Sequence, residues 1–206
     1  MVHYKLTYFD CRALGECARL LFHYADVSFE DDVVPEDHTW PEKKPSFPYG
    51  KLPVLYIDGQ PLAESNAINR YLAKQFGLAG KDHWETAQLD SIGDFYKDVY
   101  AELMPYLYKK LGYMEGDYTL LTDSFVASTE KLFPVYVKLL NESGSGFFAK
   151  SGVTWVDFLV ANYLLNIRMH EPEILKKYPE LEEHVDRVHS LPKVKEYVEK
   201  RPNWKF

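Results

Sequence analysis

The first stretch of the chain sets two short apolar runs around one amphipathic segment. Tyr4–Phe9 has the β-branched and aromatic content of a strand, and Val27–Glu30 repeats that signal. Between them, Ala13–Ala25 places its apolar residues at helical spacing. A strand, a helix and a strand in this order predict two parallel strands joined by a right-handed crossover.

A loop and a hairpin are predicted next. Residues 40–50 contain three prolines, which favours an ordered loop with room for one helical turn. The apolar runs Val54–Ile57 and Gln60–Ala63 are separated only by Asp58-Gly59, a dipeptide that supplies the positive φ angles of a two-residue turn. These two runs therefore predict an antiparallel pair of strands.

One more helix completes this part of the chain. Ser65 is a good N-cap for a helix that runs to about Phe76, and Gly77 is a stop signal. The predicted order is βαβ followed by ββα, which is the arrangement of the thioredoxin-like fold. We therefore expect an α/β thioredoxin-like domain over residues 1–78.

The rest of the chain follows a different pattern, because the alternation typical of strands does not recur. Long helices are predicted over 83–111 and 117–141, each with an internal proline that is expected to kink it. Another helix begins at Thr154, where Asp157 completes a capping box. The sequence therefore predicts an all-α domain over residues 79–206.

Composition and charge narrow the classes of partner. Hydrophobic residues make up 46% of the chain and charged residues 27%, which is typical of a globular protein. The net charge is −7 and no run of Lys or Arg exceeds two residues, which argues against nucleic acids and anionic membranes as partners. No segment approaches the ~20 apolar residues of a membrane span, and the N-terminus resembles a strand rather than a signal peptide. With two cysteines and no disulfide framework, we expect a cytoplasmic protein.

The seven histidines predict no metal site. Two histidines four residues apart with an acid nearby would favour zinc, and the chain contains no such pair. Its two nearest histidines, His184 and His189, stand five residues apart. We therefore expect chemistry without a metal.

Tyr8 stands where a thioredoxin-like domain faces its ligand, at the end of the first strand. Cys11 and Cys17 do not form a Cys-x-x-Cys pair, which argues against disulfide exchange. A tyrosine hydroxyl can instead donate a hydrogen bond to a thiolate. Lowering a thiol pKa by two units takes about 2.7 kcal/mol, and one charge-assisted hydrogen bond supplies about 1.5–3 kcal/mol. From position alone, this role and ordinary strand packing are equally good interpretations of Tyr8.

Three further segments offer groups suited to a peptide ligand. Pro53 precedes a strand where thioredoxin-like folds use a cis bond, which would turn the backbone groups of Leu52 outward. Glu64 and Ser65 lie at a helix N-terminus, where the N–H groups and hydroxyl can receive a carboxylate and Glu64 an ammonium group. Donors for a second carboxylate come from Trp40, Lys44 and Lys51. Each segment alone has a simpler interpretation, as a cap or as solvated charges, but together they describe a site for glutathione.

Four stretches carry a resemblance to a known family. Tyr4–Phe9 resembles the first strand, with the catalytic tyrosine, of the cytosolic glutathione transferases, most closely the sigma-like group with its nematode branch. Residues 48–55 are similar to the cis-proline segment, 62–72 to the γ-glutamyl site and its helix, and 154–158 to the capping box of the second domain. The resemblance implies a homodimeric detoxification enzyme that activates glutathione, its co-substrate, as a thiolate and conjugates it to apolar electrophiles.

The resemblance also implies residue roles. Tyr8 would stabilise the thiolate. The remaining contacts to glutathione would come from Trp40, Lys44, Lys51, Leu52, Pro53, Glu64 and Ser65, and from Asp98 of the partner subunit. Tyr49 would lie at the dimer interface. The apolar substrate would contact residues chosen by family position and apolar character, namely Phe9, Leu14, Tyr100, Met104 and Phe206.

The chain departs from the family pattern around the thiol pocket, and two other functions stay open. Ala13 stands where a glycine often follows the arginine, Cys17 stands where many members have proline, and Cys11 lies close to the pocket. One alternative is a carrier of bulky, planar apolar ligands such as haem. The other is peroxide or thiol-transfer chemistry through Cys11. Prostaglandin isomerisation, known in the sigma-like group, is neither favoured nor excluded by these residues.

Overall fold

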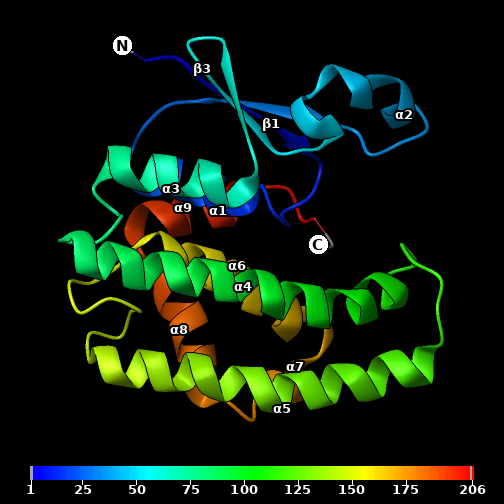
Figure 1. Ribbon diagram of the computed structural model, residues 1–206, viewed down its shortest axis with the longest axis vertical. Coiled ribbons are helices and arrows are strands. Elements are labelled where there is room, and N and C mark those ends of the chain that lie inside the picture. The colour runs from blue at the N-terminus through cyan, green and yellow to red at the C-terminus, as the bar shows by residue number, and fades with distance from the viewer. Residues whose placement is uncertain (1, 205) are drawn as a thin grey trace. The chain divides into compact units, whose positions relative to one another are not determined.

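The computed structural model describes residues 2–204 and 206 and divides into two compact units (Figure 1). The first unit contains the residues up to Ala79 together with those from Arg187 onward, and the second runs from Gly80 to Asp186. The sequence-based division assigned 187–206 to the helical domain, whereas the structure packs this segment within the first unit. Among the described residues, no helix is both long enough and apolar enough to span a membrane.

A four-stranded sheet with the order β2-β1-β3-β4 forms the base of the first unit. β1 (Tyr4–Phe9) pairs in parallel with β2 (Glu30–Val34), which confirms the predicted parallel pairing. On its other side β1 pairs antiparallel with β3 (Val54–Ile57), and β3 pairs with β4 (Gln60–Ala63) across the predicted hairpin turn. The sheet is therefore mixed, as expected for a thioredoxin-like domain.

The strand predicted over Val27–Glu30 lies further along the chain, as β2. The observed strand carries Asp31 and Asp32, a residue type that strands disfavour. Asp31 accepts a hydrogen bond from the Arg19 Nε atom at 3.0 Å, and Asp32 lies 3.1 Å from the Lys5 Nζ atom. Cations on neighbouring elements thus offset the poor strand propensity of the acidic residues.

Two helices, α1 (Glu16–Tyr24) and α3 (Ser65–Phe76), lie side by side, and α9 (Pro192–Lys200) packs against α1 (Figure 1). They bury an apolar core in which Leu6, Leu20, Leu21, Phe22, Leu55 and Leu72 are inaccessible to solvent. The proline-rich loop after β2 forms the short helix α2 (Trp40–Lys43) and the 3-10 turns Lys44–Ser46 and Pro48–Gly50.

Helices make up the second unit. They are α4 (His83–Lys110), α5 (Tyr118–Ser143), α6 (Trp155–His170), α7 (Pro172–Leu175) and α8 (Pro179–His189), the last of which crosses the boundary between the units. α4 and α5 run side by side, and α6 packs against α4 (Figure 1). Pro105 and Pro134 lie inside α4 and α5 rather than ending them.

The predicted capping box is present at the start of α6. The backbone N–H and the hydroxyl of Thr154 both donate to the buried Asp157 carboxylate, at 2.8 and 3.0 Å. The Phe148 N–H donates to the same carboxylate at 2.9 Å. Gly93 of α4 lies against Trp155, because a Cβ added to it would fall within 3.1 Å of three atoms of the indole ring. The start of α6 is thus held by hydrogen bonds and by close packing.

Candidate functional site

The register of the sheet aligns the three strands that carry the predicted site. Thr7 of β1 pairs with Val54 of β3, and Val54 pairs with Ala63 of β4. Tyr8, Pro53 and Glu64 are the chain neighbours of Thr7, Val54 and Ala63 on the same side. They therefore lie together at one end of the sheet. Tertiary pairing thus brings together a phenol, a proline segment and a carboxylate from three separate stretches of sequence.

Tyr8 is held by the loop that follows it. Its side chain is 4% exposed, and the Leu14 N–H donates a hydrogen bond of 3.1 Å to its hydroxyl oxygen. Gly15 lies directly against the ring, since an added Cβ would fall within 3.0 Å of three ring atoms. Because a hydroxyl that already accepts a hydrogen bond becomes a better donor, this loop prepares Tyr8 to donate its proton.

Glu64 and Leu52 occupy specialised backbone positions. The Leu52–Pro53 bond is cis, as the sequence predicted. Glu64, rather than Ser65, is the N-cap residue of α3, with φ 72° and ψ 115°. A non-glycine residue in such a conformation costs about 1–3 kcal/mol and is typical of functional sites. Ser65 is the first residue of the helix, so its N–H is among those that a helix leaves without an internal partner.

The predicted donors for the second carboxylate lie on α2 and the turns after it. Trp40 begins α2, and its ring contacts the Phe9 ring at a centroid distance of 4.8 Å. Lys44 and Lys51 are exposed on either side of the Pro48–Gly50 turn, and the Lys44 stem lies against Gly50. Two exposed ammonium groups and an indole N–H from this segment can receive a carboxylate.

A cluster of buried charges lies next to Tyr8, and the sequence analysis missed it. The side chain of Arg19 is fully buried, with its Cζ atom 5.8 Å from the centroid of the Tyr8 ring. Its Nη1 and Nη2 atoms donate to the carbonyl oxygens of Cys11 and Phe9, at 2.7 and 3.3 Å. The available signal was an arginine on the apolar face of a short amphipathic helix.

Glu16 supplies the buried negative charge of this cluster. It is inaccessible to solvent and pairs with Arg201, while the Tyr197 hydroxyl donates to it at 3.2 Å. Arg19 lies 3.4 Å from the same carboxylate. Burial raises the pKa of the Tyr197 phenol, and the negative charge of Glu16 adds to that effect. Tyr197 therefore stays protonated and acts as a donor.

The C-terminal residues pack against the same loop. The Arg12 N–H donates to the Phe206 carbonyl at 2.6 Å, and the Arg12 side chain donates to the Trp204 carbonyl at 2.8 Å. The Trp204 ring lies 4.7 Å from the Arg19 Cζ atom. Phe206, a predicted substrate contact, thus lies beside the loop that follows Tyr8, and it is 5% exposed.

Cys11 is poorly suited to act as a nucleophile. Burial raises the pKa of its thiol to about 11, although the charge of Arg19 and a hydrogen bond with Tyr8 act in the opposite direction. Thiolate, not thiol, is the reactive form of cysteine, and at this pKa little of it is present near neutral pH. The structure therefore gives no support to thiol-transfer chemistry through Cys11.

The remaining predicted residues lie on α4 in the second unit. Asp98 is exposed, Tyr100 is half-buried and Met104 is 1% exposed. The hydroxyls of Tyr100 and Tyr108 are hydrogen-bonded to each other at 2.6 Å. The predicted apolar-substrate residues are thus divided, with Phe9, Leu14 and Phe206 in the first unit and the other two in the second.

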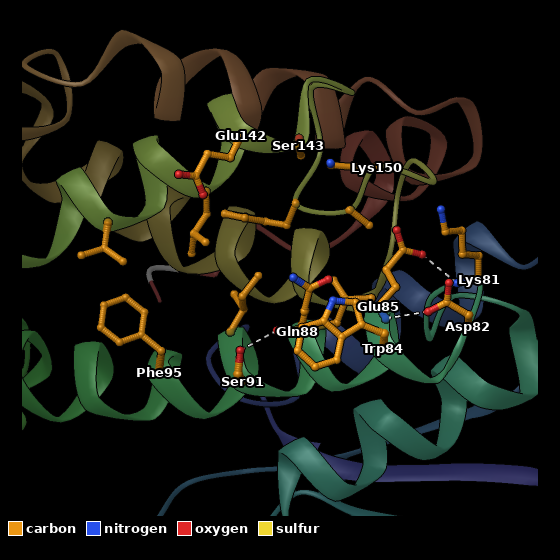
Figure 2. A pocket seen from close by; sticks show the side chains of 16 residues that line it. Lys81, Asp82, Trp84, Glu85, Gln88, Ser91, Phe95, Glu142, Ser143 and Lys150 are labelled. Atoms are coloured by element: carbon orange, nitrogen blue, oxygen red, sulfur yellow. Dashed lines mark hydrogen bonds between the residues drawn. The ribbon is translucent and has the colours of Figure 1, made fainter.

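The second unit also contains a hollow of about 820 Å³ between α4 and α5 (Figure 2). Its walls include Trp84, Leu89, Ile92, Phe95, Val135 and Leu139. Charged groups of both signs, Lys81, Glu85, Glu142 and Lys150, lie around it. Glu85 is held in place by the Lys81 N–H and the Ser151 hydroxyl, each at 2.7 Å. Among the described residues, no cluster of three or more His, Cys, Asp or Glu side chains is arranged to hold a metal ion.

Comparison with known proteins accounts for both units. Residues 4–74 match the glutathione S-transferase N-terminal domain, and residues 96–201 match the glutathione S-transferase C-terminal domain. The chain is 41% identical to a probable glutathione S-transferase 7 from Caenorhabditis elegans and 43% identical to glutathione S-transferase 1 from Ascaris suum. In both cases the match covers 98% of each chain. It is also similar to monomeric Na-GST-3 from the hookworm Necator americanus, at 40% identity and a TM-score of 0.92, covering 99% of this chain and 100% of the other.

Proposed function

The chain belongs to the glutathione S-transferase family and conjugates glutathione, and we propose that Tyr8 is the residue that activates the glutathione thiol. The alignment of Tyr8, Pro53 and Glu64 at one end of the sheet carries this proposal. A tripeptide bound along that end would place its central residue at the backbone of the Pro53 segment and one of its ends at the N-terminus of α3. The side chain of its central residue would then lie near the Tyr8 hydroxyl.

Each part of glutathione has a partner in this arrangement. The γ-glutamyl carboxylate and ammonium groups bind at Ser65 and Glu64, where free N–H groups of α3 favour an anion. The cysteinyl backbone pairs with Leu52, and the glycyl carboxylate binds Trp40, Lys44 and Lys51. The strained backbone of Glu64 fits this role, because such conformations persist where binding geometry matters.

Tyr8 donates its hydroxyl proton to the sulfur as a hydrogen bond and so favours the thiolate. The Leu14 N–H, which points at the phenol oxygen, strengthens that donation. One charge-assisted hydrogen bond is worth about 1.5–3 kcal/mol, so Tyr8 can lower the thiol pKa by about one to two units. The thiolate then attacks an electrophilic carbon of an apolar substrate, for which Phe9, Leu14 and Phe206 of the first unit are the proposed contacts, and the leaving group or the adjacent atom accepts the electron pair.

Tyr8→Phe tests this role. We expect the thiolate absorbance of bound glutathione to titrate at a pKa one to two units higher than in the unmodified enzyme. We also expect kcat/KM to fall by about 10–100-fold, with KM for glutathione little changed. Tyr4→Phe is the matched control, since it removes a hydroxyl from the same strand and the same face. A low thiol pKa that survives in Tyr8→Phe would refute the assignment.

We propose further that two copies assemble, with Asp98 of one subunit reaching the glutathione of the other. The Tyr49 ring is 78% exposed on a turn where φ is +56°, so an apolar side chain is displayed to solvent. The hollow between α4 and α5 has apolar walls, and Trp84 beside it is 74% exposed, so this surface could receive an apolar side chain such as Tyr49 of a second copy. A cytoplasmic location and a role in detoxification accord with this assignment and stay predictions.

Sedimentation of the purified chain tests assembly, and the test is needed because a relative 40% identical is described as monomeric. We expect a dimer whose dissociation constant rises at least 10-fold in Tyr49→Ala, because a central aromatic anchor is lost. Tyr113→Ala is the control, since Tyr113 is 62% exposed on the loop after α4. A monomeric unmodified chain would overturn the dimer without affecting the Tyr8 assignment.

A further inference from the structure

Arg19 is a buried cation beside Tyr8 to which the proposed chemistry gives no role. Its guanidinium lies between two aromatic rings, 5.8 Å from the centroid of Tyr8 and 4.7 Å from that of Trp204. The side chain is entirely inaccessible to solvent. Because water does not screen a charge in such a place, its field acts on neighbouring groups more strongly than a surface charge would.

Arg19 also holds the loop that orients Tyr8. It donates hydrogen bonds to the carbonyls of Phe9 and Cys11, the first and third residues after Tyr8. Its Nε atom is anchored on the other side by both carboxylate oxygens of Asp31, at 3.1 and 3.0 Å. The rigid fork of a guanidinium suits this bridging role, which a lysine could not fill in the same way.

Guanidinium groups outnumber the buried or partly buried carboxylates that pair with them. Arg12 and Arg19 are buried and the Arg201 side chain is 7% exposed, and their paired carboxylates are Glu16 and Asp31. Two further carboxylates, Asp10 and Glu36, oppose this positive charge at Cys11, but they are exposed and therefore screened by solvent. Asp31 keeps 30% of its side chain exposed, so its negative charge is more strongly screened than that of Glu16.

A sulfur atom already present in the protein reports this field. The Cys11 thiol is within hydrogen-bonding reach of the Tyr8 hydroxyl, and the charge of Arg19 lowers its pKa against the larger opposing effect of burial. A glutathione sulfur bound at the Tyr8 hydroxyl lies in the same neighbourhood. It therefore experiences the same positive charge.

We propose that Arg19 is a positioning residue that favours the glutathione thiolate, by holding the Tyr8 loop and by placing a buried positive charge behind it. The proposal rests on Tyr8 as the hydrogen-bond donor to the thiolate. It adds a second source of stabilisation that needs no contact with glutathione.

The other titratable or charged groups around the cluster are Asp10, Cys11, Glu16, His23, Asp31, Glu36, Tyr197 and Arg201. Burial lowers the pKa of His23 and raises that of Tyr197, and the Cys11 thiol titrates near pH 11. These shifts move the titrations of His23, Tyr197 and Cys11 out of the range between pH 6.5 and 9, in which the thiol of glutathione is followed.

The variant Asp31→Asn distinguishes an electrostatic role of Arg19 from a structural one, because the direction in which it shifts the pKa of bound glutathione differs between the two. Removing the negative charge leaves Arg19 less neutralised, so we expect the pKa of bound glutathione to fall by roughly half a unit to one unit. In Arg19→Gln the charge is lost while amide donors remain, and we expect the pKa to rise by about one unit with KM for glutathione within twofold. Asp26→Asn is the matched control, because Asp26 is exposed in the same unit and pairs only at the surface with Lys193, at 3.6 Å.

The outcomes distinguish this proposal from the one on which it rests. If the unmodified enzyme shows no lowered thiol pKa, or if the lowering survives in Tyr8→Phe, the Tyr8 assignment fails. If the lowering depends on Tyr8 but Asp31→Asn leaves it unchanged or reduces it, Arg19 does not act through its charge and the present proposal fails alone. Asp31→Asn decides the matter even if Arg19→Gln does not fold, since Asp31 lies near the surface.

Discussion

In each of the two units an aromatic ring packs directly against a glycine, but the two contacts serve different purposes. Tyr8 lies on Gly15 in the first unit and Trp155 lies on Gly93 in the second, and neither glycine has room for a Cβ atom. Trp155 is 1% exposed in the core of the second unit, whereas the hydroxyl of Tyr8 accepts a hydrogen bond from the Leu14 N–H and is the group that we propose binds the thiol. The same packing device therefore secures stability in one unit and the placement of a reactive group in the other.

The units differ more sharply in how they treat a buried carboxylate. Glu16 of the first unit is surrounded by guanidinium groups and a phenol. Asp157 of the second receives hydrogen bonds from two backbone N–H groups and a hydroxyl, with His184 3.7 Å away. Burial raises the pKa of Asp157 to about 7 despite these donors. The first unit thus surrounds its buried carboxylate with cations, whereas the second surrounds Asp157 with hydrogen-bond donors and suppresses its charge by burial.

Asp157→Ala is expected to have the largest effect on stability. It leaves buried donors of Phe148 and Thr154 without an acceptor, and we expect a loss of about 4 kcal/mol in the free energy of unfolding. Asp117→Ala is the control, since Asp117 caps α5 at an exposed position with one bond of 3.1 Å, and should cost about 1 kcal/mol. Urea unfolding of both variants measures the difference. Equal losses would show that burial adds nothing to the capping box.

The pH dependence of stability sharpens the contrast between the two carboxylates. Because the pKa of Asp157 is higher in the folded chain than in the unfolded chain, its contribution is complete at pH below about 4 and is lost as pH rises through about 7. Asp157→Asn removes this titration. We expect the difference in free energy of unfolding between the two proteins to change by about 2–4 kcal/mol over that window. A flat difference would mean that Asp157 is ionised in the folded protein throughout.

The paired glycine variants are expected to have the smallest effects and to diverge in kind. Gly93→Ala should lower the free energy of unfolding by about 1–3 kcal/mol, because Trp155 has no space to move, with activity per folded molecule unchanged. Gly15→Ala should displace the Tyr8 ring and reduce kcat/KM about 10-fold. Thermal unfolding and steady-state kinetics on both variants give the comparison. Loss of activity in Gly93→Ala at full folding would contradict it.

Most elements of the fold could be predicted because their signals are local. The structure confirms β1, β3 and β4 within the predicted bounds, along with Gly77, whose φ of 73° ends α3. The exception is β2, which begins at the residue where the predicted strand ends. Its aspartates pair with Arg19 and Lys5, which offset their low strand propensity, and a propensity taken from the sequence alone does not include such partners.

The candidate site likewise contains residues that the sequence could predict and one that it could not. Tyr8 and Pro53 could be singled out from their positions relative to strands, and family resemblance supplied their roles. Arg19 could not be singled out, because an arginine among apolar residues of a helix is equally typical of a side chain whose charged end reaches solvent. Its burial follows from α9 and from Trp204, which are far away in the sequence and close in the fold.

Local chemistry in the chain was sufficient to define β1, β3, β4, the hairpin turn and the C-terminal end of α3, and it singled out Tyr8 as a candidate. Turn and capping preferences act over a few residues, so they can be read without any partner. The alignment of Tyr8 with Pro53 and Glu64, the glycine beneath the ring and the charge behind it arose only on folding. Strand register and burial depend on contacts between distant segments, and these determine how strongly a charge acts on its neighbours.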